Sequence, residues 1–544
     1  MRPTRLGGVH HSVRAIAAAV TAALLATGCT GLPTRTFQAP TAPVTDSPSA
    51  PATPIPSAAG ITIAATPSPS VDRPVLPAVD VTPEGFVDAP VGEGLRGYLT
   101  QDVQWVACGN GRECADILVP LDYANPSAQA ITLAVKRLPA SKTPHLGPLF
   151  LNPGGPGGPG KDMPDTLQRD GLEQYDLIGW DPRGAGESTP VVCFGAKETD
   201  AYNDLDSSPD DAAETSALIK GAYDFGRSCW QHSGTLLEHI STIETVRDLD
   251  LMRRLLGDKS LNYLGYSYGT AIGATYAELF PFHTGRLVLD AAVDITDDKE
   301  IIQAMGFDLA LGNFAAWCAA QKCDLGRTKQ AVLDTITGLW DDLDAKPLEV
   351  GDRMLTQTLA VVGVAAFLYG GEQAWPSLST SINATVKGRG DGLLWGADLL
   401  NSRNERGSYD TMFYAFPAIS CLDSTDDGIV DAEHLWSQDE KKAPIFGKYF
   451  GPGFLCPLWP VRPARQLDIR GDGAPPILVI GATGDNATPY QQAVTMAKQL
   501  TSGVLVTWEG EGHGTYGGKS ACVDSIVVNY LVKGTVPKDG VRCR

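Results

Sequence analysis

The feature that most constrains this chain is the pentapeptide at 265–269, which reads Gly-Tyr-Ser-Tyr-Gly. An apolar run at 261–264 precedes it, and a helix-compatible stretch at 270–280 follows it. A G-x-S-x-G turn between a strand and a helix bends so sharply that glycines are needed around the serine. The bend lifts the serine hydroxyl clear of the sheet, near the free N–H groups of the helix start. The pattern therefore predicts a nucleophile at Ser267.

Strand and helix patterns alternate on both sides of this turn. A capping-box pattern at 241–244 opens one predicted helix, and 523–531 forms a closing helix. Strands that alternate with helices imply a mostly parallel, doubly wound α/β sheet. The predicted strands lie at 115–119, 131–138, 148–151, 175–180, 261–264, 286–290, 476–480 and 504–508.

A largely helical stretch interrupts the alternation. Helical patterns at 300–320, 329–343 and 356–369 fall within residues 295–473, which we expect to form a cap inserted over the site. The apolar run inside the third pattern has only ten residues, which favours a buried helix over a membrane span. Residues 86–294 and 474–544 are expected to form the two parts of the α/β core.

Two more candidate catalytic residues lie just past the ends of predicted strands, as Ser267 does. They are Asp485 and His513, and no other histidine of the eight has a glycine-flanked position at a strand end. In an open parallel sheet the carboxyl ends of the strands share one edge, so these residues can converge. His513 would accept the proton of Ser267, and Asp485 would hold the imidazole tautomer. Asp290 and Asp472 are the nearby carboxylates, with structural roles open to them.

A loop rich in glycine and proline, residues 152–160, follows the third predicted strand. It fits the phosphate-binding pattern G-x-x-x-x-G-K, but Asp162 stands where Ser or Thr should hold magnesium, and its prolines lack N–H donors. An oxyanion hole is the better interpretation. Gly155 is the favoured donor, with Gly154 as the alternative, and the amide of Tyr268 would be the second donor.

The chain order Ser, Asp, His is that of the α/β-hydrolases. The chain resembles the secreted actinobacterial tripeptidyl aminopeptidases of that fold, which are related to proline iminopeptidases, and is also similar to mycobacterial envelope lipoprotein proteases. The resemblance covers residues 95–543. It implies an α/β-hydrolase fold and a serine exopeptidase that releases tripeptides or other short peptides from free amino termini, with no metal or other cofactor. The matching segments are 152–157, 181–184, 247–250, 265–270, 418–423, 485–489, 512–514 and the tail from Cys522 to Cys543.

Other functions remain open beside this one. A carboxylesterase or lipase would use the same triad, and a non-catalytic envelope binding protein would have lost a triad member or the glycine loop. Epoxide or haloalkane hydrolysis is disfavoured, because those reactions need an Asp where Ser267 stands. The residue that would anchor the amino group of a peptide is not evident, and the cap acids Glu300 and Glu372 are candidates only by position.

The first 28 residues have the pattern of a secretory signal, with arginines, then the uncharged run 15–26, then small residues. Cys29 directly follows Leu-Ala-Thr-Gly, which resembles a lipobox. We expect lipidation of Cys29 and anchoring to the outer face of the cytoplasmic membrane, with simple secretion as the alternative. Residues 29–85 are rich in Pro, Ala, Thr and Ser, which predicts a disordered tether.

The charge balance bears on partners. The chain has 63 acidic and 43 basic residues, for a formal net charge of −20. Such a chain has no basic surplus to replace the counterions of nucleic acid, which disfavours nucleic acid as a partner. The acidic surplus is compatible with attraction of a cationic substrate such as a peptide amino terminus.

Ten cysteines remain when Cys29 is set aside, and an even number in an exported chain indicates disulfides. A metal site is disfavoured, because the chain has no C-x-x-C pair and no His-rich partner. The spacing suggests pairs of sequence neighbours, although spacing alone leaves other connectivities open. The suggested pairs are Cys108 with Cys114, Cys193 with Cys229, Cys318 with Cys323, Cys421 with Cys456, and Cys522 with Cys543.

Overall fold

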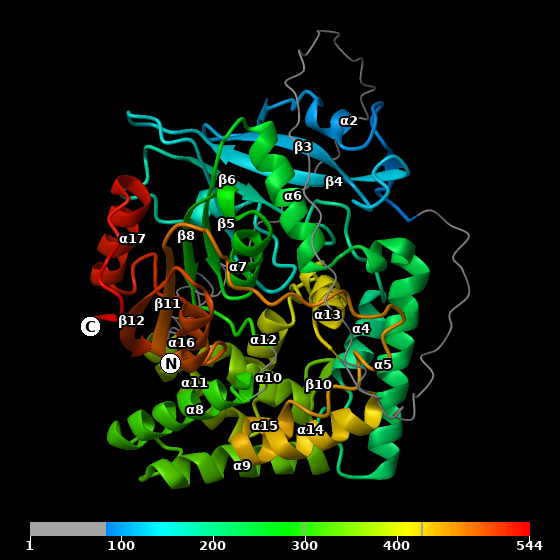
Figure 1. Ribbon diagram of the computed structural model, residues 1–544. Coiled ribbons are helices and arrows are strands. Elements are labelled where there is room, and N and C mark those ends of the chain that lie inside the picture. The colour runs from blue at the N-terminus through cyan, green and yellow to red at the C-terminus, as the bar shows by residue number, and fades with distance from the viewer. Residues whose placement is uncertain (1–82, 297–299, 426–427) are drawn as a thin grey trace, which may run out of the picture. The chain divides into compact units, whose positions relative to one another are not determined.

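A computed structural model describes residues 83–296, 300–425 and 428–544. The signal sequence, Cys29 and most of the expected tether lie outside these residues. An eleven-stranded sheet forms the centre of the described chain (Figure 1). From one edge to the other its strands are β13 (Val541–Cys543), β12 (Gly503–Glu511), β11 (Ile477–Gly484), β8 (Thr284–Asp290), β7 (Leu261–Tyr266), β5 (Pro148–Asn152), β6 (Asp176–Trp180), β4 (Gln129–Leu138), β3 (Glu113–Pro120) and β2 (Val106–Ala107), with β1 (Val87–Asp88) paired to β4.

The seven strands from β6 to β13 run parallel, and the amino-terminal strands β1 to β4 are antiparallel. All eight strands predicted from apolar runs form, each shifted by at most four residues at its ends. The predicted α/β fold with a mostly parallel sheet is therefore confirmed. Because the strands are parallel, the residues that follow them meet at one edge of the sheet.

Helices cover both faces of the sheet, and the strands supply apolar side chains to each. Leu287 and Leu289 of β8 belong to one buried cluster, whereas Val288 between them belongs to the opposite one. Successive side chains of a strand point to opposite faces, so a strand buried on both faces supplies apolar residues to each in turn. The helices of the first face are α6 (Thr242–Leu255), α7 (Gly269–Leu279) and α16 (Tyr490–Gln499), and those of the second are α3 (Met163–Thr166) and α17 (Ala521–Lys533).

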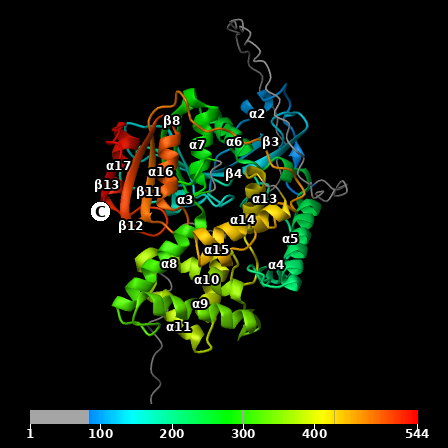
Figure 2. The same ribbon diagram turned by 60° about the horizontal axis from the view of Figure 1, so that its bottom comes forward.

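A helical cap with its own apolar core, which includes Phe314, Trp340 and Val364, follows β8. Helices α8 to α11 gather together in both views (Figures 1 and 2). The three helices predicted here form, and no helix in the described ranges has both the length and the hydropathy to cross a bilayer. The cap elements are α8 (Gln303–Ala320), α9 (Lys329–Ala345), β9 (Leu348–Val350), β10 (Arg353–Leu355), α10 (Gln357–Leu368), α11 (Trp375–Val386), α12 (Asp391–Leu400), α13 (Met412–Asp423), α14 (Ile429–Lys442) and α15 (Phe446–Tyr449).

Two helices, α4 (Ala196–Asn203) and α5 (Ala212–Ser233), lie where the sequence predicted no helix. They fall within residues 86–294, which we expected to belong wholly to the core. The ring of Phe225 on α5 lies 6.2 Å from that of Phe413 on α13, so α5 packs against the cap. We therefore propose that the cap has two parts. Helices α4 and α5 precede Ser267 in the sequence, and helices α8 to α15 follow it.

Five disulfides join the ten cysteines of the described chain, in the pairs that the spacing suggested. The one between Cys522 and Cys543 ties α17 to β13, and the one between Cys421 and Cys456 ties α13 to the segment after α15. The remaining three join Cys108 to Cys114, Cys193 to Cys229, and Cys318 to Cys323.

A fully buried ion pair fixes the turn after β6 to helix α6. The guanidinium of Arg183 donates from Nε to Asp248 Oδ2 over 2.7 Å and from Nη2 to Asp248 Oδ1 over 2.6 Å. Its other nitrogen donates to the carbonyl oxygens of Leu121 and His239. The buried guanidinium of Arg183 therefore has a structural role.

Because Asp248 supplies the counter-charge of a buried guanidinium, we expect Asp248→Asn to lower the free energy of unfolding by about 3–5 kcal/mol. Urea denaturation followed by circular dichroism measures this change. Lys142 forms an exposed pair with Glu173 at 3.0 Å, and Lys142→Ala should cost less than about 1 kcal/mol. Equal losses in the two variants would contradict the structural role of the buried pair.

Candidate active site

Ser267 occupies the turn between β7 and α7 in a backbone conformation that serine rarely adopts, with φ at 54°. A Cβ added at Gly265 would lie 2.5 Å from the carbonyl oxygen of Gly269. One added at Gly269 would lie 2.7 Å from Oδ1 of Asn152. Both glycines of the pentapeptide are therefore required by the close approach of neighbouring atoms.

Hydrogen bonds hold this turn from both sides. The N–H of Ser267 donates to the carbonyl oxygen of Asp290 over 2.9 Å, which links the turn to the end of β8. The carbonyl oxygen of Ser267 accepts the N–H of Thr270 at 2.9 Å and its hydroxyl at 2.6 Å. The backbone of Ser267 is thus held at both ends while its side chain lines a cavity.

His513 and Asp485 form a hydrogen-bonded pair. Nδ1 of His513 lies 2.8 Å from Oδ1 of Asp485, a carboxylate that is almost completely buried. The same oxygen accepts the backbone N–H groups of Ala487 and Thr488 at 3.0 and 2.9 Å. Because Nδ1 faces the carboxylate, Nε2 is the nitrogen left for other partners.

The structure brings Ser267 and His513 to the wall of one cavity of about 800 Å³. The core supplies the glycine loop and Tyr268 to this wall, and the cap supplies mainly apolar side chains. Apolar side chains around a site lower the local dielectric and strengthen polar interactions beside them. The apolar cap and α5 residues that line the cavity are Phe225, Phe307, Val362, Ala365, Leu400, Met412, Phe413, Phe416, Phe450 and Leu455.

The glycine loop contacts the serine turn at Gly154. A Cβ there would lie 2.5 Å from the carbonyl oxygen of Tyr266 and 2.9 Å from the Cβ of Ser267. The N–H of Gly154 is occupied, because it donates to Oδ1 of Asn152 over 2.9 Å. Within the described residues, the amides of Gly155 and Tyr268 have no such acceptor. Of the two glycines weighed from the sequence, Gly155 is therefore the one whose N–H is not already bonded within the described chain.

Two polar residues near the site were not predicted to have a part in it. Asn152 ends β5 and orients Gly154, while Asp423 of α13 accepts the hydroxyl of Tyr268 at 2.7 Å and the N–H of Thr242 at 2.9 Å. Both lie in segments that carry the family resemblance, which was the signal available. The cap acids Glu300 and Glu372 do not line the cavity.

One group of three side chains in the described chain could supply metal ligands, and it does not line the cavity. Its members are Asp206, Glu214 and Asp344. The carboxylate of Glu214 already accepts the backbone N–H groups of Asp210 and Asp211 at the start of α5.

The match to known proteins is extensive. The family model of the TAP-like proteins, which are α/β-hydrolases, matches residues 443–543. The serine protease Hip1 of Mycobacterium tuberculosis is 35% identical over 483 residues, covering 82% of this chain and 91% of that protein. The chain belongs to the TAP-like α/β-hydrolase family, and it is a hydrolase.

Two further relatives carry different activity names. A tripeptidyl aminopeptidase of Streptomyces lividans is 31% identical over 463 residues, covering 79% of this chain and 83% of that protein. A protein named carboxylesterase B of Mycobacterium tuberculosis is 35% identical over 453 residues, covering 79% of this chain and 86% of that protein. Relatives at this similarity therefore include both peptidase and esterase names.

Asp290 connects the serine turn to the loop that carries His513. Its backbone oxygen binds Ser267, and its Oδ2 accepts the N–H groups of Thr515 and Tyr516 at 2.9 and 2.6 Å. Burial raises the pKa of Asp290 from 3.8 to about 6, and the two N–H donors oppose this only in part. Asp290 was weighed as an alternative to Asp485, but its carboxylate positions a loop and does not contact the imidazole.

The folded state holds the proton of Asp290 more tightly than the unfolded chain does. The stabilisation that comes from the raised pKa of Asp290 is therefore fully present below about pH 4. It is lost as the pH rises to about 6. We expect the stability of Asp290→Asn, relative to the unsubstituted protein, to rise between these pH values and then to level off. Urea denaturation at several pH values measures it. A difference for Asp290→Asn that does not vary with pH would contradict the assignment.

Proposed function

We propose that this chain is an exported serine peptidase that releases tripeptides or other short peptides from free amino termini. The observation that carries the proposal is the single cavity whose wall holds Ser267, His513 and the glycine loop beneath the cap. A cavity of about 800 Å³ that is walled by cap side chains has room for a short peptide end. The relatives named as a serine protease and a tripeptidyl aminopeptidase support the same reaction class.

In the proposed acylation step, Oγ of Ser267 attacks the carbonyl carbon of the scissile amide while Nε2 of His513 takes its proton. Negative charge develops on the carbonyl oxygen, which would accept the N–H groups of Gly155 and Tyr268. Asp485 stabilises the imidazolium through Nδ1. His513 then gives the proton to the leaving amine as the C–N bond breaks. The amino-terminal short peptide stays bound to Ser267 as an ester.

Deacylation follows the same path with water as the nucleophile. His513 takes a proton from water, whose oxygen attacks the ester carbon, and then returns the proton to Oγ of Ser267 as the ester bond breaks. The products are the short peptide acid and the free serine. The chemistry needs no metal or other cofactor, because the chain's own groups supply base, acid and oxyanion donors.

The place of action follows from the amino-terminal sequence. A signal at 1–28 would export the chain, and acylation of Cys29 would hold it at the outer face of the cytoplasmic membrane. The tether at 29–85 would let the catalytic part reach peptides at a distance from the lipid surface. Simple secretion without lipidation is the alternative, in which the protein is released.

A carboxylesterase is the second candidate, and the relative named carboxylesterase B favours it. The same triad would then act on an ester whose alcohol leaves more readily than an amine. The two functions differ in one measurable property, because only an exopeptidase of the proposed kind requires a free amino group on its substrate.

The test compares three chromogenic substrates: a free tripeptidyl anilide, its amino-acetylated form and a short acyl ester. We expect the free anilide to be cleaved much faster than the acetylated one, and Ser267→Ala to lower its turnover about a million-fold. Ser525→Ala, which alters an exposed serine on α17, is the matched control and should retain full activity. Turnover of the ester alone would favour the esterase, and unchanged turnover in Ser267→Ala would overturn the serine mechanism.

A further inference from the structure

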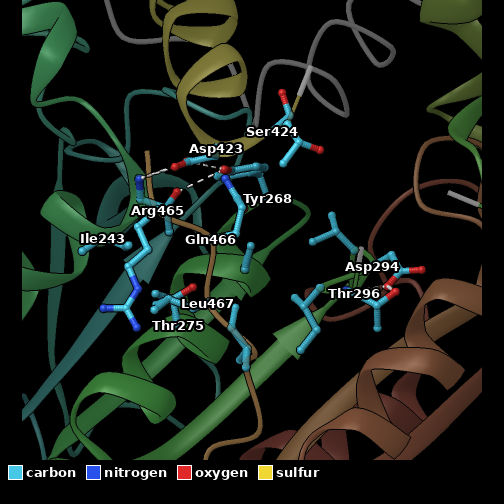
Figure 3. A pocket seen from close by; sticks show the side chains of 16 residues that line it. Ile243, Tyr268, Thr275, Asp294, Thr296, Asp423, Ser424, Arg465, Gln466 and Leu467 are labelled. Carbon is cyan, nitrogen blue, oxygen red and sulfur yellow. Dashed lines mark hydrogen bonds between the residues drawn. The ribbon is translucent and has the colours of Figure 1, made fainter. Parts of the chain in front are cut away.

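Asp294 is the one carboxylate among the cavity-lining residues in the described part of the chain, and none of those residues is Lys or Arg. It lies four residues after the end of β8, between the core and the cap. Figure 3 shows a second, smaller cavity of about 290 Å³. Tyr268, Val293 and Asp294 line both this cavity and the first. Asp294 therefore places a negative charge where the two cavities meet.

The carboxylate of Asp294 is oriented but not neutralised. Its Oδ1 accepts the backbone N–H of Thr296 at 2.9 Å and the hydroxyl of Thr296 at 2.7 Å. No Lys, Arg or His nitrogen of the described chain lies within 4 Å of it, and its Oδ2 has no donor there. A carboxylate held through one oxygen leaves the other available to a bound cation.

The other acid of the smaller cavity is already occupied. Asp423 accepts the hydroxyl of Tyr268 and the N–H of Thr242, and Figure 3 shows it beside Tyr268, whereas Asp294 lies with Thr296 on a different wall. Arg465 is an exposed residue that lines the smaller cavity but not the larger one, which contains Ser267. Of the two acids around the joined cavities, Asp294 alone has an oxygen free for a ligand.

We propose that Asp294 binds the free α-ammonium group of the peptide substrate. The inference rests on the proposed function and names the residue that would give it exopeptidase specificity. An ammonium group that enters a mainly apolar cavity loses its hydration and needs a charged partner there. Three extended residues span at most about 10 Å, so the anchor must share a cavity with the nucleophile, as Asp294 does with Ser267.

The test uses hydrolysis of the short acyl ester as the readout, because this reports Ser267 whether or not peptides are cleaved. A free tripeptide and its amino-acetylated form serve as competitive inhibitors of the full-length protein. We expect the free tripeptide to inhibit about 10- to 150-fold more strongly, which is the range for a hydrogen bond to a charged group. In Asp294→Asn this preference, measured within each variant against its own ester turnover, should disappear, and Asp294→Glu should keep most of it.

Glu372→Gln is the matched control, since it removes an exposed cap acid that does not line the cavity. It should leave the preference intact. Equal inhibition by both tripeptides of the unsubstituted protein, or a preference that survives in Asp294→Asn, would overturn the role of Asp294.

The same experiment separates this inference from the proposed function. If the tripeptidyl anilide is not cleaved but inhibition depends on the amino group and on Asp294, the anchor stands and the peptidase function fails. If the free anilide is cleaved in preference to the acetylated one and Asp294→Asn has no effect, the peptidase stands and the anchor is wrong.

Discussion

The site depends on how closely the backbone of the serine turn packs against the glycine loop. Ser267 has a φ of 54°, a conformation that costs roughly 1–3 kcal/mol and persists only where the surroundings enforce it. Here they do so through bonds to Asp290 and Thr270 and through contact with Gly154. Any side chain at Gly154 would overlap the turn, so the loop and the turn have one joint arrangement. That arrangement places Ser267, Gly155 and Tyr268 together on the wall of one cavity.

The carboxylates of Asp485 and Asp290 at this edge of the sheet accept backbone amides, and neither forms an ion pair with a Lys or Arg of the described chain. Asp485 accepts the amides of Ala487 and Thr488, and Asp290 accepts those of the loop after His513. Backbone donors fix Asp485 without adding a second cation that would compete with the imidazolium of His513 for its carboxylate. The loop with the histidine is thereby held against β8, whose end also holds the serine turn. Ser267 and His513 are therefore both positioned through the end of β8.

Much of this fold could be predicted, because the relevant signals are local. Apolar runs of four to eight residues mark the strands, and the pentapeptide around Ser267 marks the turn. Strand ends converge in a parallel sheet, which placed Asp485 and His513 together before any contact was known. The capping residues Asp211 and Glu214 at the start of α5 were a readable signal that was overlooked.

The remaining features depend on contacts between distant residues, which one sequence does not reveal. The packing of α5 on α13, the amide partners of Asp290 and the unpaired oxygen of Asp294 all arise from the tertiary arrangement. Glu300 and Glu372 were considered as amine anchors because they lie in the cap sequence, yet neither lines the cavity. Position along the chain identifies a domain, but it does not identify which side chains of that domain face its cavity.

The central claim is that Ser267 is the nucleophile, because its turn places it on one cavity wall with His513 and the glycine loop. The most direct measurement is reaction of the purified protein with a fluorophosphonate, followed by proteolysis and mass spectrometry of the modified peptide. The account predicts one adduct per chain, located on Ser267, which fails to form in His513→Ala. An adduct on another serine, or equal labelling of the denatured and folded protein, would contradict it.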